Sequence, residues 1–119
     1  MKDSHMEFPA DVVAGSTVRD KIVGAAEAVA LIRDGDTIAV EGFAGQCFAE
    51  ELTLALESRF LQSGTPRALT LVFAVAQGDR SGRGTDRLCH EGLLKRAIGG
   101  RWGMSRELGK MAVENTIEA

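Results

Sequence analysis

Two glycine-rich stretches carry the residue types in this sequence that are best suited to hold a ligand. The first, residues 41–49, places Gly42 and Gly45 directly after a short apolar run. The bare backbone N–H groups of such a turn can approach a ligand closely, and a helix that starts just after it adds a partial positive charge. The pattern indicates a site for an anion, a phosphate or a carbonyl oxygen, although many strand–glycine–helix turns form only a tight corner.

The second stretch, residues 77–87, contains Gly78, Gly82 and Gly84. It lacks the Gly-Lys-Ser/Thr ending of a phosphate-binding loop and the glycine order of a dinucleotide motif. It too follows an apolar run. Both stretches are therefore predicted at the carboxyl ends of strands, where open α/β sheets bind their ligands.

Side chains that could act as nucleophiles or metal ligands are few. Cys47 is either a thiol nucleophile or a small buried apolar residue, and the second is favoured because no His or Lys is spaced to lower its pKa. Cys89 is expected to be buried in the same way, since on a helix it and His90 would point about 100° apart rather than form a dyad. With His5 as the only other histidine, we expect no metal site.

The elements that must position these residues alternate along the chain. Apolar periodicity predicts helices with one buried face, and continuous apolar runs predict buried strands. The expected helical faces are Ala25, Ala28, Val29 and Ile32; Leu52, Ala55, Leu56 and Phe60; and Met104, Leu108, Met111 and Ala112. In chain order we expect a helix at 25–32, a strand at 37–40, a helix at 50–62, a central strand at 69–76, a short helix at 86–94, a strand at 96–100, a helix at 104–112 and the start of a strand at 116–119. This order predicts an α/β fold, a mostly parallel sheet flanked by helices and joined by right-handed crossovers.

The composition fits one small soluble domain of 119 residues, with 45% hydrophobic and 26% charged residues. We see no signal peptide, membrane span or nucleic-acid motif, and two cysteines suggest a reduced, cytoplasmic protein. Residues 1–6 look like an expression-vector remnant and residues 8–20 like a leader. The carboxyl-terminal third is rich in basic residues, which could face phosphates or simply form solvated helix surface.

Residues 34–52 resemble the amino-terminal signature of family I coenzyme A transferases. Asp34-Gly35, the apolar run and Gly42-Phe43 fit that signature, whereas three positions depart from it: Glu41 and Cys47 replace glycines, and Ala49 replaces a proline. A Cys at a position that needs positive φ would be costly. Further blocks at residues 69–84, 90–103 and 110–119 also resemble the family. They are most similar to single-chain bacterial enzymes of the acetate, propionate and acetoacetate type.

The resemblance implies that residues 21–119 form the amino-terminal part of a first CoA-transferase domain, in an architecture that sugar-phosphate isomerases share and that is incomplete at its carboxyl end. In the family, a glutamate attacks an acyl-CoA and carries CoA as a glutamyl thioester, so CoA is a substrate and no other cofactor is implied. That glutamate lies outside this chain. Glu41 is interpreted as a substituted position, and Glu91 and Glu114 as surface or helix residues. No catalytic residue is expected here. The residues expected to line the acyl or acceptor pocket, or else only to pack, are Gly42, Phe43, Gly45, Ala74, Val75, Gln77 and Gly78.

Three hypotheses follow. The chain is part of a CoA transferase and inactive alone, or a binding or assembly module that completes a site with a partner chain, or a relative of the sugar-phosphate isomerases. A buried parallel strand needs cover on both faces, and an unpaired edge favours association. We therefore expect either a homo-oligomer or contact with the remainder of the enzyme or a second CoA-transferase subunit.

Overall fold

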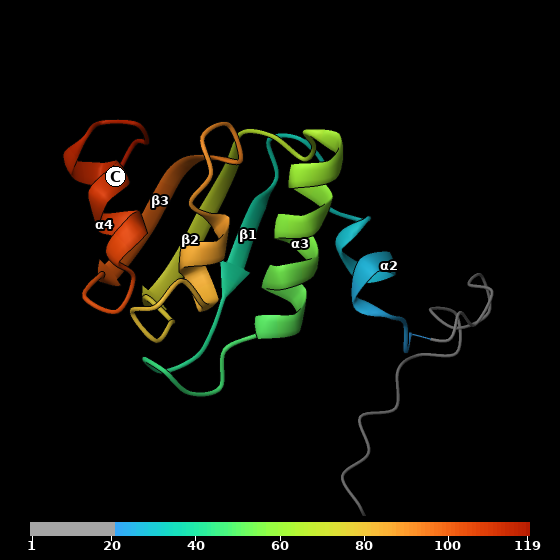
Figure 1. Ribbon diagram of the computed structural model, residues 1–119, viewed down its shortest axis with the longest axis horizontal. Coiled ribbons are helices and arrows are strands. Elements are labelled where there is room, and N and C mark those ends of the chain that lie inside the picture. The colour runs from blue at the N-terminus through green and yellow to red at the C-terminus, as the bar shows by residue number, and fades with distance from the viewer. Residues whose placement is uncertain (1–20) are drawn as a thin grey trace, which may run out of the picture.

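Three parallel strands form the centre of the fold (Figure 1). The computed structural model describes residues 21–119, and the predictions made for residues 1–20 lie outside the described residues. The strands are β1 (Thr37–Val40), β2 (Leu69–Val75) and β3 (Leu94–Arg101), in the order β1-β2-β3. The α/β fold and the central place of β2 are thus confirmed, and β3 begins two residues earlier than predicted.

Across residues 21–119, three helices and one short 3-10 helix connect and flank the strands. They are α2 (Ala25–Val29), α3 (Glu50–Ser63), η1 (Gly84–Leu88) and α4 (Arg106–Val113). The helix predicted at 86–94 is wrong, because only the single 3-10 turn of η1 forms there. The carbonyls of Gly92 and Leu93 instead accept hydrogen bonds from Ala68 and Leu69, so this segment is already part of the strand ladder. None of these helices is long and apolar enough to cross a membrane.

The inward face of α3 differs from the predicted one at a single turn. Leu56 and Phe60 are buried as expected, but Leu52 is exposed and Thr53 takes the inward place. Its hydroxyl donates to the carbonyls of Ala49 and Glu50, at 3.2 and 3.0 Å. Because both of those carbonyls lie within the helix's own first turn, a polar residue is satisfied there without any distant partner.

The start of α4 is held by a side chain from a distant element. Asp86, in η1, accepts a hydrogen bond from the hydroxyl of Ser105 and another from the backbone N–H of Glu107, at 3.1 Å. The two donors lie at the N-cap and in the first turn of α4, where backbone N–H groups lack partners within the helix. Leu108 and Met111 are buried on its inner face, as predicted.

One face of the sheet is closely packed, and we call it the covered face. Its row across the strands includes Ile38, Leu71 and Ala97, of which the last two are fully buried. On the next row the ring of Phe73 lies over Gly99, where any added Cβ would clash with the ring. Trp102 contacts the same ring edge-on, with centroids 5.4 Å apart.

The opposite face, which we call the second face, is much more exposed. Its rows pair Ala39 with Val72 and Val72 with Ile98. Ala39 is exposed, and so is Ile98, at 52%. The strands follow one another in the sheet in the same order as in the chain. Right-handed crossovers then place all the connections on one side of the sheet. Consistent with this, α3 contacts η1 and η1 contacts α4, so these helices form one layer.

The two edges of the sheet also differ. Beyond β3, Glu118 forms a single parallel bridge with Arg96, and the predicted strand start at 116–119 appears only as this bridge. Within residues 21–119, β1 pairs with β2 alone. In a parallel ladder, every second residue of a strand bonds to the same neighbouring strand. Thr70 donates to the carbonyl of Asp36, so the main-chain groups of Thr37 and Ala39 point the other way, toward the free edge of β1.

Candidate functional site

The first glycine-rich stretch folds into a tight turn at the carboxyl end of β1. Phe43 and Gln46 exchange two backbone hydrogen bonds, of 3.0 and 2.9 Å, which close the turn around Ala44 and Gly45. Ala44 and Cys47 both have positive φ, +52° and +57°. Side chains with a Cβ are strained in that region by about 1–2 kcal/mol. Cys47 therefore occupies a glycine-type conformation, as a glycine-to-cysteine replacement implies.

The two glycine-rich stretches contact each other directly. The backbone N–H of Gly78 donates to the carbonyl of Ala44 at 2.9 Å. A Cβ on Gly45 would lie 3.5 Å from the carbonyl oxygen of Gly78, and a Cβ on Gly42 would lie 3.0 Å from Cγ of Gln77. Bare backbone from both strand ends thus meets at one place.

The second stretch closes on itself around the backbone of Gln77. The carbonyl of Gln77 accepts from both the N–H and the hydroxyl of Thr85, at 2.9 and 2.8 Å. A Cβ on Gly84 would clash with this same carbonyl, and a Cβ on Gly78 would lie 2.6 Å from the carbonyl oxygen of Arg83. The glycines here permit a close crossing of two backbone segments.

Four of the seven predicted pocket residues come together at this contact: Gly42, Gly45, Gln77 and Gly78. The buried side chain of Gln77 donates to the carbonyl of Val75 at 2.7 Å and to that of Val40 at 3.5 Å, and so it links the ends of β2 and β1. Phe43 lies on the same turn and is 69% exposed. Ala74 and Val75 lie one step back on β2, where successive side chains leave opposite faces. A pocket-lining role for these residues stays a prediction.

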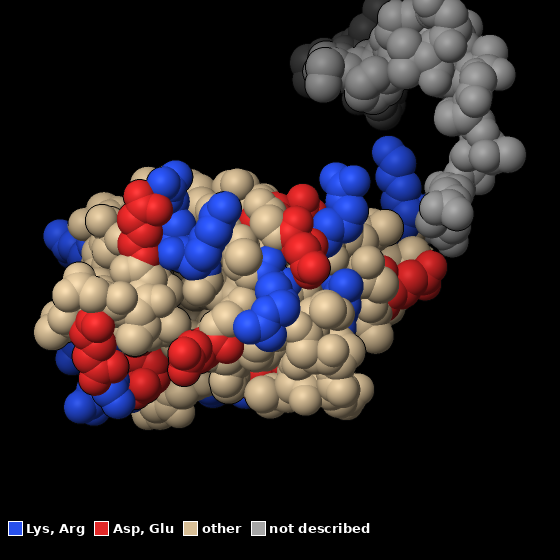
Figure 2. Space-filling view, turned by 90° about the horizontal axis from the view of Figure 1, so that it is seen from above, with Lys and Arg blue, Asp and Glu red and all other residues tan. Residues whose placement is uncertain are grey.

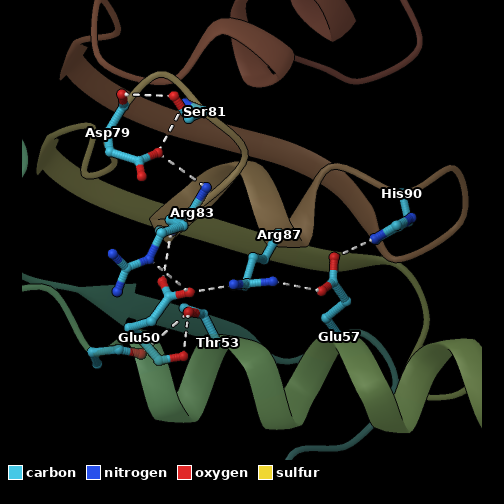
Figure 3. Close-up of polar contacts among 10 residues, drawn as sticks. Glu50, Thr53, Glu57, Asp79, Ser81, Arg83, Arg87 and His90 are labelled. Atoms are coloured by element: carbon cyan, nitrogen blue, oxygen red, sulfur yellow. Dashed lines mark hydrogen bonds and ion pairs between the residues drawn. The ribbon is translucent and has the colours of Figure 1, made fainter.

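A group of charged side chains, the Glu50 cluster, fastens the second stretch to α3. It consists of Glu50, Glu57, Arg83, Arg87 and His90 (Figure 3). The carboxylate of Glu50 accepts the backbone N–H of Gly84 at 2.8 Å and also the guanidinium of Arg87, and Arg83 lies 3.5 Å from it. Glu57 pairs with Arg87 at 3.2 Å and with Nε2 of His90 at 2.8 Å. Glu50 and Glu57 of α3 are therefore both engaged by the opposite segment.

The surroundings of Glu50 favour its charged form. Partial burial by itself would raise the pKa of this carboxyl, but the N–H of Gly84 and the cationic side chains of Arg87 and Arg83 more than offset that effect, so the pKa lies below its usual value. The same contacts raise the pKa of Arg87, chiefly through the hydrogen bond to Glu50. Glu50 and Arg87 are therefore held as an ion pair at neutral pH.

Comparisons with known proteins now supply the context. The chain matches no family model. It is 38% identical over 102 residues to the acetate CoA-transferase YdiF of Escherichia coli K12 and equally to that of E. coli O157:H7, and the match covers 85% of this chain. A caffeate CoA-transferase of Acetobacterium woodii is 39% identical over 74 residues, which is 62% of this chain.

The solved structures agree with the sequences. A YdiF acyl-CoA transferase from E. coli O157:H7, in a thioester complex with CoA, superposes with a TM-score of 0.75 over 80% of this chain, at 38% identity. The chain is homologous to a segment of the CoA-transferases. It spans 19% of the length of the YdiF relatives. The sequence resemblance and the expected fold are thereby confirmed, and the two contacting glycine stretches lie in the part of the chain that is similar to CoA-transferases.

The two cysteines lie in contrasting places. Cys47 is exposed, so the expectation that it is buried is wrong: it lies at the end of the first turn, after β1, and does not pack against the core. Cys89 packs against the core, and its thiol lies 3.5 Å from the carbonyl of Thr85. Burial raises the pKa of the Cys89 thiol, with the charges of Asp86 and Glu107 adding to the effect.

The Glu50 cluster is the feature that sequence reasoning missed. A signal was present, because Glu50 and Glu57 are seven residues apart on one face of α3, and Arg83 and Arg87 are four apart. Elsewhere, Arg96 pairs with Glu118 at 2.7 Å. On the side of the molecule seen in Figure 2, basic and acidic side chains are interspersed rather than gathered by sign. Among residues 21–119, no three potential metal ligands are grouped.

Proposed function

We propose that this chain forms part of a CoA transferase that moves CoA between short-chain carboxylic acids. The observation that carries the proposal is the contact of the two glycine stretches at the carboxyl ends of β1 and β2, through Gly78 and Ala44. This contact lies in a segment 38% identical to a transferase solved as a CoA thioester complex. It is also the usual place for a ligand in an open α/β sheet.

The chemistry we propose proceeds through a glutamyl-CoA intermediate. A carboxylate attacks the acyl-CoA thioester and releases CoA as a thiolate, which leaves a mixed anhydride. The thiolate then attacks the glutamyl carbonyl and releases the first acid. The second acid takes CoA by the reverse sequence. This is covalent catalysis, and backbone N–H groups can stabilise the oxyanions that form.

In this scheme the described residues supply shape and backbone donors rather than the nucleophile. Glu50 is engaged by Gly84 and Arg87, and Glu57 by Arg87 and His90, so neither is a free carboxylate. The nucleophilic glutamate is placed in polypeptide beyond this segment. CoA enters as a substrate, without a separate cofactor, and the free cysteines support a reducing, cytoplasmic setting.

The test compares the chain alone with a hybrid enzyme. In the hybrid, residues 21–119 replace the matching segment of E. coli O157:H7 YdiF. Transfer of CoA from acetyl-CoA to propionate is followed by chromatography. We expect no turnover by the chain alone and measurable turnover by the hybrid. Turnover by the chain alone at roughly 1 s⁻¹ or more, an ordinary enzyme rate, would overturn the placement of the glutamate. A well-folded hybrid without transfer would overturn the proposed function.

A further inference from the structure

The carboxylate of Glu50 joins the start of α3 to the second glycine-rich stretch (Figure 3). One of its oxygens accepts the backbone N–H of Gly84 at 2.8 Å, and the other accepts the guanidinium of Arg87. Hydrogen bonds to an ionised acceptor are shorter and roughly twice as strong as those between neutral groups. The carboxylate therefore fixes where the backbone of Gly84 lies.

Gly84 in turn lies against the backbone that precedes it in the loop. A Cβ on Gly84 would stand 2.4 Å from the carbonyl oxygen of Gln77 and 2.8 Å from Cα of Gly78. The next residue, Thr85, donates both its N–H and its hydroxyl to that same carbonyl of Gln77, at 2.9 and 2.8 Å. Segments packed this closely transmit a displacement instead of absorbing it. A shift of Gly84 would therefore move Gln77 and Gly78 as well.

Gln77 and Gly78 carry the contact at which we place the ligand. The N–H of Gly78 donates to the carbonyl of Ala44 in the first stretch, at 2.9 Å. The side-chain amide of Gln77 donates to carbonyls at the ends of β2 and β1. A continuous series of contacts thus runs from Glu50 through Gly84 to the place where the two glycine-rich stretches meet.

We propose that Glu50 is a positioning residue for CoA transfer, because by holding Gly84 it sets how Gly78 meets Ala44. The inference rests on the proposed function. Backbone donors stabilise an oxyanion well only when they are aimed before the reaction begins. A misplacement of about 1 Å can cost roughly a hundredfold in rate. Glu50 acts through the backbone that it holds and takes no part in the bond changes themselves.

Glu57 provides a matched control on the same helix. Its side chain is almost as buried as that of Glu50, with 17% against 20% exposed. Within residues 21–119 it pairs with the side chains of Arg87 and His90, at 3.2 and 2.8 Å, and not with the backbone of Gly84. Removal of Glu57 should therefore disturb the same group of charges without releasing the loop.

The first test measures amide hydrogen exchange by NMR in the chain itself. In Glu50→Ala we expect the N–H groups of Gly84 and Gly78 to exchange at least roughly tenfold faster relative to the N–H of Thr70 in β2, because the loop opens without global unfolding. In Glu57→Ala we expect both ratios to stay within about twofold of the parent. An unchanged ratio for Gly78 in Glu50→Ala would overturn the inference.

The second test measures kcat and KM for transfer from acetyl-CoA to propionate in the YdiF hybrid. In Glu50→Ala we expect kcat to fall at least roughly thirtyfold while KM for acetyl-CoA changes by less than about threefold, because positioning acts on the reacting groups. Glu50→Gln keeps an acceptor for Gly84, so kcat should recover to within about fivefold of the parent. Glu57→Ala should leave kcat within about twofold.

Thermal unfolding of each hybrid confirms that the assays are run on folded protein. Equal losses of kcat in Glu50→Ala and Glu57→Ala would overturn the inference, since a general loosening of the charged cluster would explain both. If Glu50→Ala left the hybrid unfolded, the exchange ratio of Gly78 in the chain itself would decide.

The two proposals fail in different ways. A folded, unsubstituted hybrid that transfers no CoA would defeat the proposed function. An active hybrid whose kcat is insensitive to Glu50→Ala would defeat the positioning role alone.

Discussion

The two glycine-rich stretches reach the same place in the fold but are built differently. The first, around Ala44 and Cys47, is closed by one pair of backbone hydrogen bonds and holds two non-glycine residues at positive φ. The second is fastened from several sides, with Gly84 at its own positive φ of +73° and its N–H on the carboxylate of Glu50. The second stretch also holds a non-glycine residue at positive φ, Arg80 at +61°, so what sets it apart is its side-chain anchor to α3.

This difference bears on the ligand site that we propose at the contact of the two stretches. A fixed stretch defines the position of the contact between Gly78 and Ala44, while an exposed turn with Phe43 at its edge offers surface. The comparison predicts that substitutions in the second stretch are severe and that those in the first are mild. The following predictions are arranged from the largest expected effect to the smallest.

Gly84→Ala should have the largest effect. Its Cβ would clash with the carbonyl of Gln77 at a positive φ, so we expect the free energy of unfolding to fall by roughly 3 kcal/mol, measured by urea denaturation. Gly82→Ala is the control: Gly82 has a φ of +94° but nothing within 4 Å of an added Cβ, so only about 1 kcal/mol of backbone strain is expected. Equal losses at both sites would show that backbone crowding at Gly84 adds nothing to the strain of a positive φ.

Glu50→Ala should come next. It leaves the N–H of Gly84 and the guanidinium of Arg87 without their shared acceptor, which should lower the free energy of unfolding by about 1–3 kcal/mol. Glu50→Gln keeps an acceptor for Gly84 and should lose about half as much. Glu51→Ala is the neighbouring exposed control. If Glu51→Ala cost as much, the effect would belong to the helix terminus and not to the anchoring of the loop.

The pH dependence of stability should report the charge on Glu50. Its pKa is lower in the folded chain than the ordinary value of 4.5, so its contribution is fully present above about pH 4.5 and is lost as pH falls through the folded-state pKa. The stability gap between the parent and Glu50→Gln should be constant near neutral pH and narrow in acid. A gap that stays the same down to pH 3 would show that charge is not what Glu50 contributes.

Cys47→Gly should have the smallest effect, and in the opposite direction. Glycine relieves the strain of a Cβ at a φ of +57° but makes the unfolded chain more flexible, so we expect a net stabilisation of only about 0.5 kcal/mol. Cys47→Ala keeps the strain and should give no gain. Thermal unfolding of the two variants side by side provides the measurement, and a destabilised glycine variant would count against strain in the first stretch.

Much of this fold could be predicted from the sequence because its signals are local. The apolar run of β2 and the Leu56–Phe60 spacing of α3 depend on residues close together in the chain. The helix predicted at 86–94 does not form because the carbonyls of Gly92 and Leu93 accept hydrogen bonds from Ala68 and Leu69. These contacts are long-range, so no local pattern reveals them. The open second face likewise follows from the order of the strands in space.

For the site, the sequence located the glycines but not what holds them. Gly42, Gly45 and Gly78 were predicted to lie at strand ends, and they do meet there. The anchor of Glu50 on Gly84 joins residues 34 positions apart, and no local pattern specifies such a pair. The family resemblance assigned no role to Glu50, Glu57, Arg83 or Arg87, so it supplied no information about the Glu50 cluster.

The packing of Phe73 over Gly99 also limits how this sequence can change. The two residues face each other across β2 and β3, and the space that glycine leaves empty is filled by the ring. A larger residue at position 99 alone would clash with the ring, and a smaller residue at position 73 alone would leave a void. The two positions therefore have to change together. A designer who wants a side chain at position 99 should shorten position 73 in the same step, for example by combining Gly99→Ala with Phe73→Leu.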